Sequence, residues 1–412
     1  MKKRRKEKLR PNFFAWTIYR TYAILRMKRR NKVKYDRTEF KNRNKKEGCV
    51  ILYNHCCMSD HFINTGLFGS TRVNYVLTKR FTFFAPIRAV LKTVRAISRD
   101  QFKNDTSSIL KMKRVVEAGG IICIAPAGQV SIHGDQPYIN PIIVKLLKMC
   151  KADVYTIQTN GSYLAYPKWA TAKRKYPISS KIKMTLTKEE LKSLSIDECY
   201  EKILSDLNVL DREYQKEKMI PIKCEDRALG LENILYICPK CGKKYTTYTK
   251  GNEIICSNCN NTIHYNKYGF LEGVGDDYVL FQDEALWYNY QKRYIMNELK
   301  NGNYSLKSTV DLYSNSINEY KLECVGHGIL EYDGEKLVYT GTMNEKEIVK
   351  EFNLNTIYQL PFAPATRFNI PDEEGMFEFV PENKRVVIEW VQLVDALNSI
   401  KIEEQENGCS NN

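Results

Sequence analysis

Long hydrophobic runs are absent from this chain of 412 residues, whose mean hydropathy is −0.46. The apolar stretch at residues 12–27 is interrupted by Arg20, and it is shorter than the roughly twenty residues that a helix needs to cross a bilayer. No small-residue cleavage site precedes Lys28, although a secretory signal peptide requires one. We therefore expect neither a transmembrane span nor a cleaved leader.

Histidine is also scarce, with five residues. Even so, a His-x4-Asp pair would arise by accident with a chance of roughly one in four, so the pair alone is weak evidence for a catalytic site. Acidic residues number 48 against 64 Lys and Arg, which gives a formal net charge of +16. This excess predicts an anionic partner, either a membrane surface or a nucleic acid. Thirteen cysteines, an odd number, indicate a reducing cytoplasm rather than a disulfide framework.

Basic residues gather near the N-terminus at residues 2–6, 28–30 and 41–46, and they flank an aromatic stretch at residues 13–25. This pattern is typical of an interfacial helix, in which apolar side chains enter the headgroup boundary and cations meet anionic lipid. We expect residues 1–46 to be a basic amphipathic segment that binds an anionic membrane surface. The protein would then be cytoplasmic and peripheral on the inner face of the membrane. The alternative is an amphipathic helix packed on the next domain.

Residues 49–60, Cys-Val-Ile-Leu-Tyr-Asn-His-Cys-Cys-Met-Ser-Asp, contain the candidate catalytic pair. The apolar run that ends at Asn54 predicts a core strand, and Ser59 with Asp60 predicts the start of a helix. His55 lies on the loop between them. A neutral imidazole there takes a proton from a substrate hydroxyl if Asp60 holds its other nitrogen. The alternative is a polar loop histidine beside a helix cap.

The chain resembles the glycerolipid acyltransferases related to 1-acyl-glycerol-3-phosphate acyltransferase in four blocks. The first is Asn-His-x4-Asp at residues 54–60, and the second runs over residues 78–99 and ends at an arginine. The third, Ile-Ala-Pro-Ala-Gly-Gln-Val-Ser at residues 124–131, stands where the family reads Phe-Pro-Glu-Gly-Thr-Arg-Ser. The fourth is residues 154–169. The resemblance covers residues 12–215, about half of the chain.

The resemblance implies an α/β acyltransferase domain, which we place at residues 47–222. It implies acyl transfer from acyl-CoA or acyl-carrier protein to the hydroxyl of a lysophospholipid such as 1-acyl-glycerol-3-phosphate. His55 and Asp60 are then catalytic. Arg99, Gly128 and Ser131 are then substrate-binding, because a guanidinium pairs with phosphate and glycine lets the backbone approach an oxyanion.

Two positions depart from the family pattern, because Ala127 and Val130 replace the glutamate and the arginine of the third block. The charges that usually surround the acceptor phosphate are therefore missing from these two positions, and the sequence does not identify the acyl acceptor. Lys79, Arg80 and the basic run at residues 173–175 are candidate replacements. A different acceptor, or a chain without activity, is the alternative. A thiol nucleophile at one of the two cysteines after His55 is disfavoured, since sequence neighbours point in different directions.

Two Cys-x2-Cys pairs, fourteen residues apart, form the second motif: Cys238 and Cys241, then Cys256 and Cys259. Four thiolates at this spacing close a tetrahedron around a structural Zn2+. Gly242 and Asn260, which tolerate left-handed backbone, follow the two pairs. We predict a zinc ribbon at residues 233–266 with a hairpin that turns at residues 251–252.

A non-enzymatic zinc-ribbon protein that binds nucleic acid is the third hypothesis. The positive charge lies beside the aromatic N-terminal stretch rather than around the ribbon, so we do not expect a nucleic acid partner.

Short apolar strands at residues 73–77, 121–125 and 154–158 alternate with helical stretches at residues 106–118 and 195–216. This alternation predicts an α/β domain with a largely parallel sheet. The second helix opens with a capping box, Ser-Ile-Asp-Glu. Residues 220–230 read as a linker, and a helix is expected at residues 284–299.

From residue 305 the pattern changes to alternation interrupted by turn residues, which predicts a small β-rich domain over residues 270–403. Its expected strands are residues 321–325, 328–332, 336–339, 347–350, 376–379 and 385–388. A closing helix at residues 390–397 gives a pattern that resembles a pleckstrin-homology-like (PH) or GRAM-like module, with a plain packing domain as the alternative. Residues 404–412 are expected to be disordered.

Overall fold

The computed structural model describes residues 8–100, 105–315, 321–372 and 375–409. These residues form two compact units. Unit 1 contains the described residues up to 168 together with 174–223, and unit 2 contains 169–173 and the described residues from 224 onward. Residues 8–46 thus fold with the domain that follows them, and the boundary at residue 223 lies inside the expected linker. The cysteine-rich and β-rich regions share unit 2.

Unit 1 is built on a seven-stranded mixed sheet with the order β1-β7-β6-β2-β5-β3-β4. All neighbouring strands are parallel except β6 and β7, so the expectation of a largely parallel sheet is confirmed. The strands are β1 (Val33–Asp36), β2 (Cys49–Tyr53), β3 (Asn74–Thr78), β4 (Ile97–Arg99), β5 (Ile121–Ile124), β6 (Val154–Asn160) and β7 (Ile178–Leu186).

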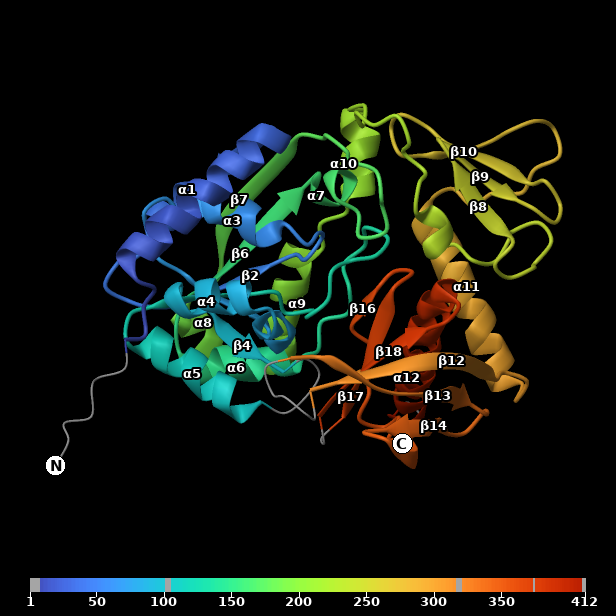
Figure 1. Ribbon diagram of the computed structural model, residues 1–412. Helices are drawn as coiled ribbons and strands as arrows, with labels where there is room; N and C mark the ends of the chain where they lie inside the picture. The colour runs from blue at the N-terminus through green and yellow to red at the C-terminus, as the bar shows by residue number, and fades with distance from the viewer. Residues whose placement is uncertain (1–7, 101–104, 316–320, 373–374, 410–412) are drawn as a thin grey trace. The chain divides into compact units, whose positions relative to one another are not determined.

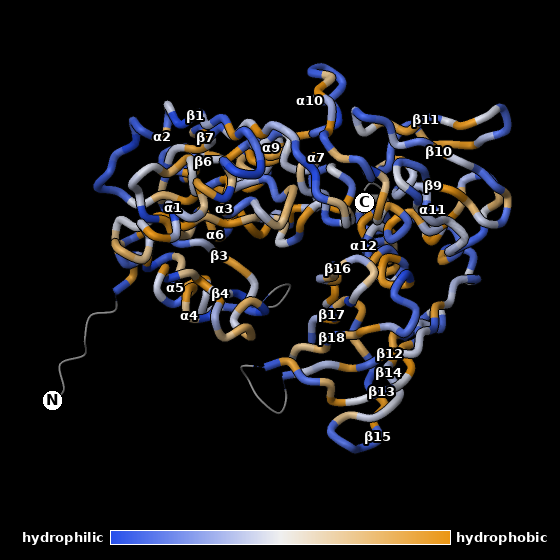
Figure 2. The backbone as a smooth tube through the Cα atoms, turned by 45° about the horizontal axis from the view of Figure 1, so that its top comes forward, coloured by the Kyte–Doolittle hydropathy of each residue, from blue (hydrophilic) through white to orange (hydrophobic). Residues whose placement is uncertain are grey.

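Helices cover both faces of this sheet, and the alternation of side chains along β2 decides which core each residue joins. Val50 and Leu52 face one core, whereas Ile51 and Tyr53 face the other. The first core includes residues of α5 (Thr106–Glu117), α6 (Ile142–Cys150) and α9 (Ile196–Leu207). The second includes residues of α1 (Phe13–Arg30) and α2 (Thr38–Lys41). Figure 1 shows this layering, and Figure 2 shows the apolar segments at its interior.

The remaining α-helices of unit 1 are short. They are α3 (Asp60–Thr65), α4 (Ala85–Thr93), α7 (Ser162–Ala165), α8 (Lys188–Ser193) and α10 (Asp211–Lys218). In the described part of the chain, no helix combines the length and the apolar character needed to cross a membrane.

The helix expected at residues 195–216 is wrong in length. Its start is confirmed, because Ser195 makes both bonds of the capping box. The helix then ends at Leu207, and Asn208, a weak helix former, caps it through its backbone N–H. A separate helix, α10, starts at Asp211.

The cysteine-rich part of unit 2 forms a four-stranded sheet with the order β11-β10-β9-β8. The expected hairpin is present, with β8 (Thr247–Lys250) paired to β9 (Glu253–Cys256) across residues 251–252. Two further strands, β10 (Thr262–Tyr265) and β11 (Leu271–Gly273), are not among those that the sequence pattern predicts. The helix α11 (Glu284–Lys300) follows, as expected.

The β-rich C-terminal region is also confirmed. Its seven strands are antiparallel in the order β15-β14-β13-β12-β18-β17-β16, so that two meanders join where β12 pairs with β18. The strands are β12 (Leu306–Ser314), β13 (Glu323–Tyr332), β14 (Leu337–Met343), β15 (Lys346–Phe352), β16 (Phe362–Ala363), β17 (Arg367–Asp372) and β18 (Gly375–Pro381). The PH-like or GRAM-like identity of this region stays a prediction.

The strand expected at residues 385–388 is wrong, because this apolar run begins α12 (Val387–Cys409). Short apolar runs fit a buried helix as well as a strand, and here the side chain of Asn383 accepts from the N–H of Arg385 to open a helical turn. The closing helix is therefore longer than the expected 390–397. Of residues 404–412, expected to be disordered, 404–409 lie within this helix and 410–412 lie outside the described residues.

Candidate active site and metal centre

The first three blocks meet at one edge of the unit 1 sheet. The strands β2, β5, β3 and β4 run parallel, with Leu52 opposite Ile124 and Thr78 opposite Arg99. Parallel strands present their carboxyl ends at the same edge, where ligands of open α/β sheets bind. The loops that follow β2, β3 and β5 therefore lie on one side of unit 1.

His55 and Asp60, the predicted catalytic pair, are in contact at this edge. Nδ1 of His55 lies 2.8 Å from Oδ2 of Asp60. The His55 side chain is 20% exposed, whereas that of Asp60 is 2% exposed. Because a carboxylate only accepts hydrogen bonds, Nδ1 carries the proton in this pair. In this tautomer Nε2 is the ring nitrogen with the free lone pair.

The loop that begins with Asn54 and His55 is held by hydrogen bonds at both residues. The side-chain amide of Asn54 donates to the carbonyl of Thr159 at 3.1 Å and accepts from the Thr159 N–H at 2.9 Å, which ties the end of β2 to β6. The N–H of Ser131 donates to the carbonyl of His55 at 2.8 Å. The third block thus supports the loop that carries the histidine.

Gly128 and Ser131, predicted to bind substrate, have visible structural roles. Gly128 adopts a φ of +70°, which favours glycine, and its N–H donates to the carbonyl of Ala125 at 3.1 Å. The hydroxyl of Ser131 accepts from the N–H of Gly134 at 2.9 Å. Contacts of either residue with substrate stay a prediction.

Arg99 lies at the carboxyl end of β4, three strands away from β2, which corresponds to about 14 Å between strand axes. Desolvation lowers the pKa of its guanidinium, and the nearby Asp105 opposes that shift. Its buried Nε has no hydrogen-bond partner among the described residues. Arg99 therefore shares the edge with His55 without contacting it, and it retains a donor for a ligand.

Ala127 and Val130 are buried, at 4% and 6% exposure. Ala127 belongs to the first core, together with Val50 and Leu52. The positions that carry charge in the resembling family therefore carry packing side chains here. The third block supplies no charge for an acceptor phosphate from these two positions.

Burial raises the pKa of both cysteine thiols after His55, Cys56 and Cys57, well above the usual value. Their sulfurs therefore keep their protons at neutral pH, and only the thiolate is nucleophilic. The thiol-nucleophile alternative is disfavoured for this physical reason.

Asp211 is a buried carboxylate near this site that the sequence pattern does not single out. It accepts from the backbone N–H groups of Gly161 and Tyr163 at 2.5 and 2.8 Å, at the start of α7. Its pKa is raised to about 6, mainly by burial and in small part by the charge of Asp60, while the hydrogen bonds from the backbone oppose this rise. An acid in the first turn of a helix is common, so no local signal distinguishes it.

The four predicted metal ligands lie together in unit 2. Their sulfur atoms are all within 4.8 Å of one another, with 3.6 Å from Cys238 to Cys259 and 3.8 Å from Cys241 to Cys256. Four sulfurs bound tetrahedrally to zinc at 2.3 Å would be about 3.8 Å apart. Gly242 and Asn260 have φ values of +70° and +57°, as expected. The donor set and its spacing therefore fit a tetrahedral ion such as Zn2+.

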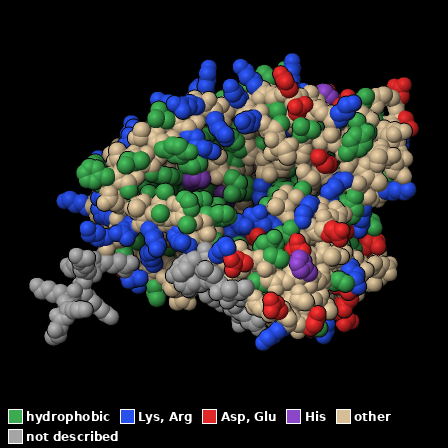
Figure 3. Space-filling view, in the orientation of Figure 1, with side chains coloured by type: hydrophobic (Ala, Val, Ile, Leu, Met, Phe, Trp, Pro, Cys, Tyr) green, Lys and Arg blue, Asp and Glu red, His purple; other side chains and the backbone are tan. Residues whose placement is uncertain are grey.

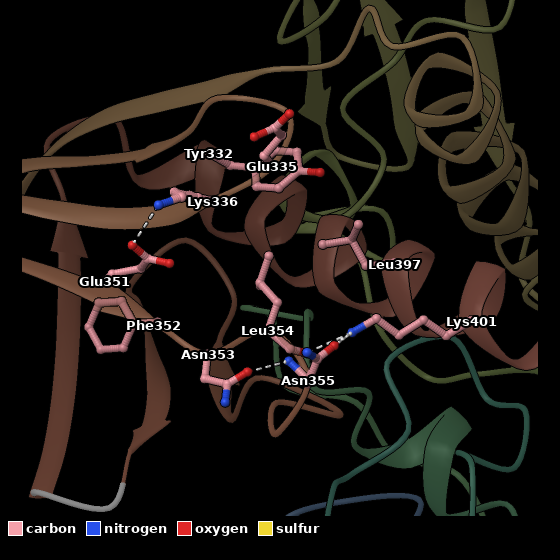
Figure 4. Close-up of a pocket in the computed structure, with 10 residues that line it drawn as sticks. All are labelled: Tyr332, Glu335, Lys336, Glu351, Phe352, Asn353, Leu354, Asn355, Leu397 and Lys401. Carbon is pink, nitrogen blue, oxygen red and sulfur yellow. Dashed lines mark hydrogen bonds and ion pairs between the residues drawn. The ribbon is translucent and has the colours of Figure 1, made fainter.

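Unit 2 also contains a cavity of about 550 Å³ in the β-rich region (Figure 4). The cations in its lining are already paired. Lys336 forms a 3.1 Å ion pair with Glu351, and Lys401 donates to the Leu354 carbonyl at 2.9 Å and to Asn355 at 3.0 Å. The rest of the lining includes the apolar side chains of Phe352, Leu354 and Leu397, so the cavity has a mixed lining in which both lysines already have hydrogen-bond partners.

Comparisons with known proteins add little to this geometry. No protein family and no curated protein matches the chain. Among solved structures, the chain is similar to the crystal structure of the 1-acyl-sn-glycerophosphate (LPA) acyltransferase PlsC from Thermotoga maritima, with 12% sequence identity and a TM-score of 0.40. The match covers 50% of this chain and 81% of that one. At this TM-score we base no argument on the likeness.

Proposed function

We propose that unit 1 transfers an acyl group from a thioester, acyl-CoA or acyl-carrier protein, to the hydroxyl of a lysophospholipid such as 1-acyl-glycerol-3-phosphate. The observation that carries this proposal is the 2.8 Å contact between Nδ1 of His55 and Oδ2 of Asp60 at the carboxyl edge of the sheet. The four sequence blocks that resemble the glycerolipid acyltransferases support it.

In the proposed reaction, Nε2 of His55 removes the proton of the acceptor hydroxyl as its oxygen attacks the thioester carbon. The charge of Asp60 stabilises the imidazolium that forms. The carbon–sulfur bond of the tetrahedral intermediate then breaks, and the leaving thiolate takes the proton from His55. The products are an ester and a free thiol, and no covalent enzyme intermediate is required.

Arg99 is our candidate for binding an acceptor phosphate, because its buried Nε has no hydrogen-bond partner among the described residues and guanidinium binds phosphate through paired hydrogen bonds. The burial of Ala127 and Val130 favours a second candidate, an acyltransferase with an acceptor other than lysophosphatidate. A phosphate-free acceptor that reacts as well as lysophosphatidate would support this second candidate.

An anionic membrane surface is the proposed partner, because α1 is apolar on two opposite faces. Trp16 and Met27 are buried in unit 1, whereas Phe14 and Ile18, on the outer face, are 74% and 71% exposed. Basic residues 28–30 end the helix. An exposed apolar stripe with basic flanks suits the headgroup boundary of a bilayer.

The helix α4 extends this exposed surface. It has no buried residue, and Ile87 and Val90 are 41% and 49% exposed. The N–H of Asn12 donates to the carbonyl of Thr93 at 3.3 Å, so the start of α1 adjoins the end of α4. In Figure 3 apolar side chains gather over both helices, with Lys and Arg around them. We propose that both helices face the lipid from which the acceptor comes.

The metal in unit 2 is proposed to be zinc with a structural role, because four thiolates leave no coordination position for water or substrate. The four cysteines would hold the ion, and its ligation would add to the packing of buried side chains such as Ile254 and Ile263.

The test is to incubate the native protein and His55→Ala with acyl-CoA and lysophosphatidic acid in anionic vesicles, and to measure thiol release and lipid product together. We expect product from the native protein only. The matched control is His327→Ala, since that histidine is 73% exposed on the β-rich region. Equal product from native protein and His55→Ala would contradict the assignment of His55, and no thiol release from native protein would contradict acyl transfer from CoA.

A further inference from the structure

Cys57 contacts both oxygens of the Asp60 carboxylate. Its backbone N–H donates to Oδ2 at 3.1 Å, the same oxygen that accepts from His55. Its thiol lies 3.1 Å from Oδ1. Among the described residues, this thiol is the hydrogen-bond partner of Oδ1. One neighbouring residue therefore sets the orientation of the carboxylate that holds the histidine.

The turn that contains these residues is already closed without the thiol. The N–H of Asp60 donates to the carbonyl of Cys57 at 3.3 Å, while the carboxylate of Asp60 accepts from the N–H of Cys57. This reciprocal pattern resembles a capping box, in which the first side chain usually accepts from the backbone. Here that side chain is directed at the carboxylate instead. The thiol therefore adds a constraint on the carboxylate that the turn itself does not need.

The Cys57 sulfur acts as a donor in this contact. Burial, and then the charge of Asp60, raises the pKa of the thiol well above its usual value, so the proton stays on sulfur. Cys57 and Asp60 are 0% and 2% exposed, which keeps water from replacing either partner. A hydrogen bond in such a site constrains its acceptor more than one exposed to water.

We propose that Cys57 is a positioning residue of the candidate acyl-transfer site. Its thiol donates to Oδ1 of Asp60 and fixes the carboxylate so that Oδ2 accepts the hydrogen bond from Nδ1 of His55. This role of Cys57 rests on the proposed function, in which His55 is the base. The contact between Cys57 and Asp60 is present whether or not the protein is an enzyme. Other titratable groups act on this cluster from the surrounding elements: Tyr53, Cys56, His61, Tyr166 and Asp211.

The experiment is an NMR titration of the histidine rings in the native full-length protein and in four cysteine variants, with one further variant to assign the His55 signal. The chain has five histidines, and His55→Asn identifies the signal of His55. Cys57→Ala and Cys57→Val remove the donor with a side chain smaller and larger than cysteine, and Cys57→Ser retains a donor. Cys56→Ala is the matched control, because the Cys56 thiol contacts the amide of Asn54 and not the carboxylate.

We expect Cys57→Ala and Cys57→Val to raise the pKa of His55 by up to about one unit, because a carboxylate with one donor fewer attracts the imidazolium more strongly. Cys57→Ser and Cys56→Ala should titrate as the native protein does. In acyl-transfer assays the rate should increase at a higher pH in these two variants than in the native protein, because the pKa of His55 is higher.

The proposal is overturned if both non-donor variants titrate as the native protein does, or if Cys57→Ser titrates as they do. Amide spectra establish that each variant is folded, and either non-donor variant suffices for the comparison. Because the titration needs no turnover, a protein without acyl-transfer activity still gives a decisive result. Failure of the proposed function and failure of this inference are therefore separate outcomes.

Discussion

Lys244 and Glu389, which are 145 positions apart in the sequence, form an ion pair with 2.5 Å between Nζ and Oε1. Glu389 lies in α12 and is 1% exposed, and its carboxylate also accepts from the hydroxyls of Tyr245 and Tyr304. Lys244 follows Cys241, a predicted metal ligand, by three residues. The metal-binding loop and the closing helix of unit 2 are thus joined at one buried carboxylate.

Replacing Lys244 by alanine should lower the free energy of unfolding of unit 2 by about 1–3 kcal/mol, because a buried carboxylate loses its cationic donor while two tyrosines remain. Urea unfolding followed by tryptophan fluorescence measures this change, since Trp287 and Trp390 are buried in unit 2. Lys243→Ala is the matched control, because Lys243 bonds the side chain of Asn258 at the surface. It should cost no more than about 0.5 kcal/mol. Equal losses in the two variants would argue against the buried link.

Removing the metal should loosen α12 as well as the cysteine loops. Structural zinc sites of this kind contribute about 10–16 kcal/mol of apparent binding free energy to folding, and Lys244 connects the site to Glu389. Metal analysis should find about one zinc per chain. Chelation or Cys256→Ser should increase hydrogen exchange in β8, β9 and α12. Cys324→Ser is the control, because that cysteine is exposed and outside the cluster. Unchanged exchange in α12 after metal loss would contradict the coupling.

A charge on the outer face of α1 should weaken membrane binding. Ile18 is 71% exposed, and burying an isoleucine in an apolar phase stabilises binding by about 1.5–3 kcal/mol. Ile18→Glu should therefore reduce binding to anionic vesicles by roughly tenfold or more, as measured by sedimentation. Thr17→Glu introduces the same charge at a neighbouring exposed polar position and should have a smaller effect. Equal effects would mean that net charge rather than apolar contact governs binding.

Asp211 should make unit 1 less stable as pH rises from about 4 to 6. Its folded pKa is raised from 3.8 to about 6 by burial, so the folded state holds this proton more tightly than the unfolded chain. The resulting stability is fully present below pH 3.8 and is lost as pH rises through the folded value, by on the order of 3 kcal/mol.

Urea unfolding at several pH values, compared between native protein and Asp211→Asn, isolates this contribution. The native protein should lose stability relative to the variant across that interval, because asparagine does not titrate. A difference between the two proteins that stays constant with pH would contradict the raised pKa.

The sequence by itself determined the features that depend on neighbours along the chain. The capping box at Ser195 and the left-handed positions at Gly242 and Asn260 follow from local backbone chemistry. His55 and Asp60 meet because five positions span one loop and the start of one helix. The Cys-x2-Cys spacing brings each pair of thiols to one site for the same reason.

Only the tertiary structure decided which distant residues support these sites. Asp211 contacts the start of α7, and Glu389 contacts Lys244, although each pair is far apart in the sequence. In the sequence, each of these two acids looks like an ordinary residue of a helix. The run from Val386 to Ile388 fits a strand or a helix equally well. Burial against the rest of unit 2 selects the helix. Free energy from packing and desolvation depends on the whole fold, so a local pattern does not contain it.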